Sequence, residues 1–238
     1  MEAYRTEEEQ VEALKRWWDE NGKSTIAAII IAISGTVIWQ TWQGQQEATQ
    51  AGASDAYQYL MNSLSAAQET GNNEPAISAA RELKESFGGT SYAQFAALHL
   101  ARMQVTEGDL ASAETELRWV LAEAPKGSDI AQITELRLAR VVAAKGDVDQ
   151  ALAILASAQG GAYAASAAMA RGDILNAAGR DAEARAAYTE ARALAAQDGQ
   201  QGALAGLEQR LASLTPIPAR ELSSSTEAVE VASPEDEQ

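Results

Sequence analysis

The chain has 238 residues, a formal net charge of −16 and no cysteine. The lack of cysteine excludes a disulfide framework, a thiol nucleophile and a lipid-modified cysteine, and it fits an oxidising bacterial periplasm without demanding one. No region of the chain is basic, which argues against a nucleic-acid partner.

Residues 1–23 are predicted to form a tail with a short amphipathic helix. Val11, Leu14 and Trp18 recur at positions i, i+3 and i+7, which places them on one helical face. Gly22 predicts the end of this helix, because glycine tolerates the left-handed conformation that ends helices. Two roles stay open for the tail, a topology anchor and a docking or regulatory element.

The next 19 residues, 24–42, contain no charged side chain. As a helix they would extend about 28 Å, close to the roughly 30 Å hydrocarbon core of a bilayer. A buried core helix is the alternative, but no other part of the chain is as apolar. Indole rings favour the membrane interface, and four of the five tryptophans flank this stretch: Trp17, Trp18, Trp39 and Trp42.

Lysine and arginine predict the orientation of this span. Four basic residues precede it, and the next one after it is Arg81. Because basic segments resist translocation, we expect residues 1–23 in the cytoplasm and the chain beyond Trp42 outside. A cleaved signal peptide is the rival interpretation. We favour an uncleaved anchor, since the Ala-x-Ala motif at 51–53 lies well beyond the span.

Beyond the span, residues 43–69 are predicted to continue as a long helix that leads from the membrane and breaks at Gly71. A second helix is predicted over residues 76–87, with its end at Gly88. This pair is interpreted as an N-terminal capping unit, because a threefold sequence repeat begins only after Tyr92. The repeat resembles the second half of a tetratricopeptide unit. Its three copies read Gly108-Asp109-Leu110 with Ala113 and Leu117, Gly146-Asp147-Val148 with Ala151 and Leu155, and Gly179-Arg180-Asp181 with Ala184 and Tyr188.

Each repeat predicts a helix pair in which glycine forms the turn and the small alanine allows close helix contact. One pair cannot cover its own apolar face, so neighbouring pairs stack. We therefore predict an all-α protein, a single transmembrane helix followed by a tetratricopeptide-like α-solenoid over residues 43–214. Residues 200–214 form its final capping helix. The acidic, proline-bearing residues 215–238 are predicted to be disordered.

The tail and three strings in the repeats resemble the YfgM family, whose members are inner-membrane proteins with a periplasmic tetratricopeptide-like domain. The resemblance implies two partners, the Sec translocon and a membrane-anchored periplasmic chaperone. It covers most of residues 1–200. It rests on Tyr4, Glu8 to Ala13, Lys15, Trp17-Trp18, Glu20 to Lys23, and the strings 117–121, 136–141 and 171–175.

The sequence contains no catalytic or metal-binding constellation that we recognise. His99 is the only histidine, and one imidazole cannot assemble a zinc site. We expect it to be a packed or surface residue of a helix. Neither cofactor nor metal is predicted, and an enzyme is disfavoured.

The repeat register predicts a concave groove that would bind unfolded or newly translocated proteins. Arg102 and Arg140 occupy equivalent positions in adjacent repeats and would form its rim above an apolar floor. The alternative is that the apolar members are inter-helix core. A second functional hypothesis is a scaffold of another cell-envelope complex without client binding. The predicted groove residues are Phe95, Leu98, Arg102, Ile133, Leu136, Arg140 and Met169.

Overall fold

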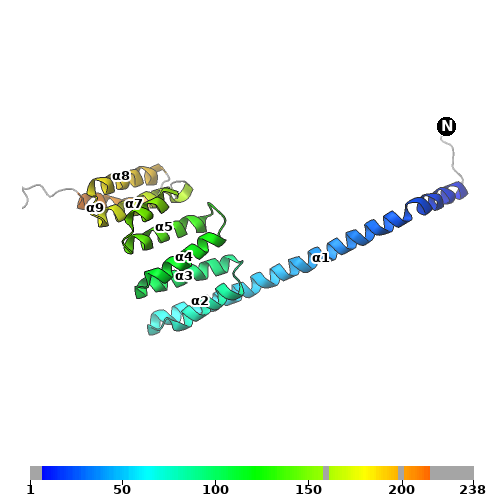
Figure 1. Ribbon diagram of the computed structural model, residues 1–238, viewed down its shortest axis with the longest axis horizontal. Coiled ribbons are helices and arrows are strands. Elements are labelled where there is room, and N and C mark those ends of the chain that lie inside the picture. Colours follow the sequence, from blue (N-terminus) through cyan, green and yellow to red (C-terminus); the bar gives the residue numbers. More distant parts are fainter. Residues whose placement is uncertain (1–6, 158–160, 198–200, 215–238) are drawn as a thin grey trace, which may run out of the picture. The chain divides into compact units, whose positions relative to one another are not determined.

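The structure is a computed structural model that describes residues 7–157, 161–197 and 201–214. All regular elements in these ranges are helices (Figure 1). The chain divides into two units, Met1–Tyr59 and Leu60–Gln238. The prediction of an all-α fold is therefore confirmed, whereas the predicted disorder of residues 215–238 lies outside the described residues.

The first unit consists of most of helix α1, which runs from Glu7 to Thr70. The predicted helix end at Gly22 is wrong, because α1 continues through this residue. One glycine in a helix interior costs only about 1 kcal/mol. Here the small residue also leaves room for Trp18, whose ring lies 3.3 Å from where a Cβ of Gly22 would be.

Helix α1 contains a stretch that is long and apolar enough to cross a membrane. Its most apolar 18-residue window has a mean hydropathy of 1.6, and none of that window is buried. A core helix of a soluble domain would instead bury its apolar residues. The four flanking indoles are also uncovered, with exposed fractions of 48, 49, 61 and 53% for Trp17, Trp18, Trp39 and Trp42.

The second unit begins with the end of α1 and continues through helices that follow one another in chain order along a stack (Figure 1). Gly71 ends α1 in a left-handed conformation, with φ 73°, as predicted. The remaining elements are α2 (Glu74–Ser86), α3 (Ser91–Glu107), α4 (Leu110–Glu123), α5 (Asp129–Ala144), α6 (Val148–Ser157), the 3-10 turn η1 (Gly161–Tyr163), α7 (Ala164–Ala177), α8 (Asp181–Gln197) and α9 (Gln201–Ser213).

The glycine of each repeat forms the turn between its two helices. Gly108 and Gly146 have φ values of 82° and 99°, a conformation that side chains disfavour. The aspartate that follows each glycine then starts the second helix, because its carboxylate accepts a backbone N–H of the first turn. Asp109 accepts from Ser112 at 3.0 Å, and Asp147 makes the equivalent bond at 3.1 Å.

The third repeat keeps the turn but replaces the aspartate by arginine. Gly179 has φ 73°. Arg180 donates two hydrogen bonds of 2.7 Å to the carboxylate of Glu183 in the first turn of α8. A second carboxylate, of Asp149 on α6, lies 3.5 Å from the same guanidinium. The arginine thus links the third repeat to the second.

The small residues predicted at close helix contacts are buried in all three repeats. Ala113, Ala151 and Ala184 are each 0% exposed. In the third repeat Gly172 on α7 faces the Tyr188 ring on α8, and a Cβ there would lie 2.4 Å from the ring. The larger residues four positions after the alanines are each 1% exposed: Leu117, Leu155 and Tyr188.

The core of this unit includes two clusters of buried apolar side chains. One extends from α3 to α7 and the other joins α7, α8 and α9 around Tyr188. Burial and a hydrogen bond to Asp173 raise the pKa of Tyr188 to about 12. Leu207 of α9 is 1% exposed in the second cluster. The predicted final helix is thereby confirmed within one residue at each end.

Candidate functional site

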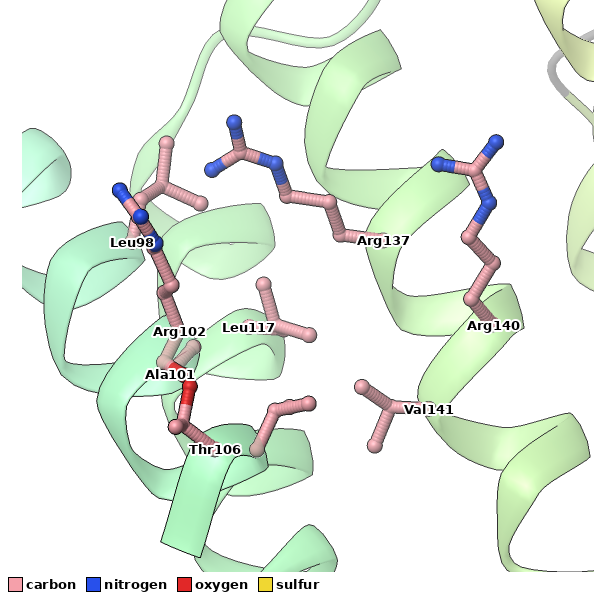
Figure 2. Close-up of a pocket in the computed structure, with 9 residues that line it drawn as sticks. Leu98, Ala101, Arg102, Thr106, Leu117, Arg137, Arg140 and Val141 are labelled. Carbon is pink, nitrogen blue, oxygen red and sulfur yellow. Dashed lines mark hydrogen bonds between the residues drawn. The ribbon is translucent and has the colours of Figure 1, made fainter.

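A cavity of about 480 Å³ lies between α3 and α5 in the second unit (Figure 2). Its apolar wall combines side chains of the first helices of two adjacent repeats with one residue of α4. Three arginines complete the lining, Arg102 from α3 and Arg137 and Arg140 from α5. The other lining residues are Leu98, Ala101, Val105, Thr106, Leu117 and Val141.

Helix geometry explains how the three arginines come together. Arg137 and Arg140 are three positions apart, so their side chains are neighbours on the surface of α5. Arg102 occupies the matching repeat position on α3, 38 residues before Arg140. In Figure 2 the guanidinium of Arg137 reaches from α5 toward the α3 side, and the other two stand on either side of it.

These arginines lack the carboxylate partners that several other basic residues of the unit have. Within the described ranges, no acidic oxygen lies within 4.0 Å of Arg102, Arg137 or Arg140. By contrast, cross-helix ion pairs join Lys84 to Glu116, Lys145 to Glu114, Arg171 to Glu190, Arg192 to Glu208 and Arg210 to Asp173.

The three arginines that line the cavity concentrate positive charge there. Burial lowers the pKa of Arg137, and repulsion from Arg102 and Arg140 lowers it further. Arginine stays protonated in proteins despite such shifts, so the three charges persist at neutral pH. An anionic group placed among them would relieve this repulsion. The arrangement therefore favours a ligand that carries a carboxylate or another anion beside apolar groups.

His99 lies on α3, close enough to Arg102 and Arg137 to feel their charges. Burial lowers its pKa, and the charges of Arg102 and Arg137 lower it further, so its imidazole is neutral at pH 7. Arg102 and His99 also line a second hollow of about 260 Å³, together with the end of α1. His99 is half-buried on α3, which matches the expectation of a packed or surface helical residue.

The structure brings together three of the predicted groove residues. Leu98, Arg102 and Arg140 line the cavity. Leu136 is only 5% exposed and belongs to the core between α3 and α7. Three other predicted residues lie outside the lining. Phe95 is 40% exposed on α3, whereas Ile133 and Met169 are half-buried against the core clusters.

Comparison with known proteins identifies the family. The family model of the tetratricopeptide repeat-like domain matches residues 15–215. The ancillary SecYEG translocon subunit of Haemophilus influenzae is 33% identical over 214 residues, which cover 89% of this chain and 97% of that protein. The chain belongs to the YfgM family. The Escherichia coli protein of the same name is 32% identical over 188 residues and covers 79% of this chain and 88% of its own length.

A solved structure shares similarity with this YfgM-family chain at lower identity. It is a thermophilic tetratricopeptide protein from Thermus thermophilus, 22% identical with a TM-score of 0.48. The similarity covers 67% of this chain and 79% of that one.

We searched the described part of this YfgM-family chain for side chains that could bind a metal ion. There, no group of three or more His, Cys, Asp or Glu side chains is arranged to hold a metal ion. The candidate site combines three cationic side chains with an apolar wall.

Sequence reasoning did not include six of the lining residues in the groove: Ala101, Val105, Thr106, Leu117, Arg137 and Val141. One signal could have found Arg137, which lies 38 residues after His99 and three before Arg140. Extending the repeat register to His99 would have placed a second basic residue on the same face of α5.

Proposed function

We propose that this chain is a non-enzymatic, inner-membrane-anchored protein-binding module ancillary to the Sec translocon. In this proposal it assists periplasmic chaperone handling of newly translocated proteins. The observation that carries it is an apolar cavity rimmed by arginines without carboxylate partners, on a tetratricopeptide-like solenoid whose chain also contains an unburied apolar span. The names of the two relatives support the translocon as partner.

The proposed topology places residues 1–23 in the cytoplasm, 24–42 in the membrane and 43–214 in the periplasm, followed by the acidic segment 215–238. Support comes from the basic residues before the span and their absence until Arg81. Protease added to spheroplasts should digest the chain beyond Trp42 and spare the tail. Protection of the solenoid, or a mature N-terminus near Ala53, would contradict this topology.

The cavity is proposed to bind protein segments rather than to fill space within a scaffold. A groove that binds varied clients needs apolar surface accessible to them. Val105 lines the cavity and is 43% exposed, so a partner could reach it. A scaffold with one fixed partner predicts a polar groove, and the cavity's apolar wall therefore favours client binding.

Photocrosslinking in native membranes tests the proposal. A photo-reactive residue at Ile30 in the span, which is 58% exposed, should capture translocon subunits. The same probe at Val105 should capture translocated proteins or a chaperone, and the control probe at exposed Thr115 on α4 should capture far less. One fixed product at Val105 would support the scaffold, and equal capture at Val105 and Thr115 would refute the binding cavity.

A further inference from the structure

The cavity between α3 and α5 has two chemical requirements for an occupant. Its apolar wall, which includes Leu98, Val105 and Val141, favours small aliphatic side chains. Its three guanidiniums favour carboxylates, because hydrogen bonds between oppositely charged groups are about twice as strong as neutral ones. An extended segment that interleaves acids and small aliphatic residues would satisfy both requirements.

The chain itself contains such a segment after α9. Residues 215–238 include six acids and one arginine, which gives them a net charge of −5. Within them, 227–232 reads Glu-Ala-Val-Glu-Val-Ala, and a further Glu-Asp-Glu run follows at 235–237. The valines match the apolar wall, and the carboxylates match the arginines.

The connection is long enough for this segment to reach the cavity. From α5 the path to α9 passes through α7 and α8, which contact one another in sequence. Three steps of 8–10 Å between packed helices, with about 10 Å more across the cavity to α3, amount to roughly 40 Å. The 15 residues from Leu214 to Val229 can extend about 50 Å. A tether of this kind also raises the local concentration of the segment to the millimolar range.

We propose that residues 227–237 occupy the arginine-lined cavity when no protein partner is bound, and that partners displace them. This inference rests on the proposed function of the cavity as a binding site. The acidic segment then acts as an internal competitor, which restricts the cavity to partners that bind it more tightly. The contact is electrostatic at its rim, so it weakens as salt screens the charges.

Disulfide trapping in the full membrane-inserted chain tests the proposal, because the chain has no native cysteine. Thr106 lines the cavity, and the pair Thr106→Cys with Val229→Cys should form an intramolecular disulfide under mild oxidation. The matched control is Thr115→Cys with Val229→Cys, since Thr115 is exposed on α4 and is not part of the cavity lining. Equal rates for the two pairs would overturn the proposal. A disulfide-linked dimer would also overturn it, because the segment would then occupy a second copy.

Charge variants identify the interaction that holds the segment. Arg137→Glu should slow trapping of the Thr106 pair, by up to about fivefold for each ion pair lost. The matched variant Lys126→Glu makes the same charge change in an exposed turn and should leave the rate unchanged. Equal effects of the two variants, or none, would refute the role of the cavity.

A second variant keeps the test valid if Arg137→Glu disturbs folding. Glu227→Gln with Glu230→Gln leaves the solenoid untouched and should slow trapping by a similar factor. The same variant should increase capture of other proteins by the photo-reactive probe at Val105. If trapping fails while the Val105 probe still captures partners, this inference is wrong and the proposed function stands. If both fail, the cavity is not a binding site.

Discussion

The contact between Gly172 and Tyr188 offers a sharp test of the packing. Gly172 is buried on α7, and a Cβ added there would lie 2.4 Å from Cε1 and 2.5 Å from Cδ1 of Tyr188. Ordinary contacts of this kind are 3.4–4 Å, so Gly172→Ala forces the ring to move by about 1 Å or more. Tyr188 is only 1% exposed and is packed in the core cluster of α7, α8 and α9.

The expected cost combines three effects. Overpacking a core typically costs about 1–3 kcal/mol. Displacing the ring also weakens the hydrogen bond that the Tyr188 hydroxyl donates to Asp173 at 2.9 Å, which is worth about 1.5 kcal/mol for a charged acceptor. Alanine recovers about 0.5–1 kcal/mol through its higher helix propensity. The net loss should be about 1.5–4 kcal/mol.

Hydrogen exchange measured by mass spectrometry on the full chain reports this loss locally. In a solenoid the effect should concentrate in α7 and α8, where exchange should accelerate by at least about tenfold. Gly44→Ala is the control, because that exposed helical glycine has open space around it. Adding Tyr188→Leu to Gly172→Ala should recover part of the protection. Unchanged or slower exchange in Gly172→Ala would refute the assigned contact.

Three further predictions follow from the same structure. Ala151→Leu should lower the free energy of local opening in α5 and α6 by about 1–3 kcal/mol, because Ala151 is 0% exposed; unchanged exchange would mean that the repeat register is wrong. His99 should titrate below 6.5 by NMR, and Arg137→Gln should raise its pKa. Unfolding restores the ordinary pKa of His99, so the unfolded chain binds more protons between about pH 6.5 and the folded-state pKa. The free energy of unfolding should therefore decrease as pH drops through this range, and His99→Gln should reduce this pH dependence. Truncation after Leu214 should leave exchange in α7 to α9 unchanged, and faster exchange there would show that the acidic segment is part of the fold.

The sequence predicted the repeat turns because local chemistry determines them. A left-handed turn needs glycine, and an aspartate caps the next helix, so Gly108 and Gly146 were recognisable without any tertiary contact. The predicted helix end at Gly22 was wrong because no such local chemistry supports it. A single glycine is a weak signal when helical residues continue on both sides, and Gly22 provides room for Trp18.

The candidate site was only partly predictable, because burial depends on how neighbouring helices pack. Leu98 and Leu136 occupy equivalent repeat positions, yet only Leu98 lines the cavity. Both are buried in the same core cluster, at 8% and 5% exposed, and the sequence pattern does not reveal that the cavity lies beside Leu98 alone. Arg137 was missed because its repeat equivalent is His99, and the two differ in chemical type although they share a position.

Photocrosslinking from Val105 in an Arg102→Glu/Arg140→Glu variant tests the central claim, that the arginine-lined cavity binds protein segments. The matched control is Arg81→Glu/Lys126→Glu, which makes the same charge change at two exposed positions outside the cavity lining. The cavity variant should lose capture of translocated proteins or chaperone, whereas capture through the span should persist and the control should behave as the unmodified chain. Undiminished capture in a folded cavity variant would contradict the claim.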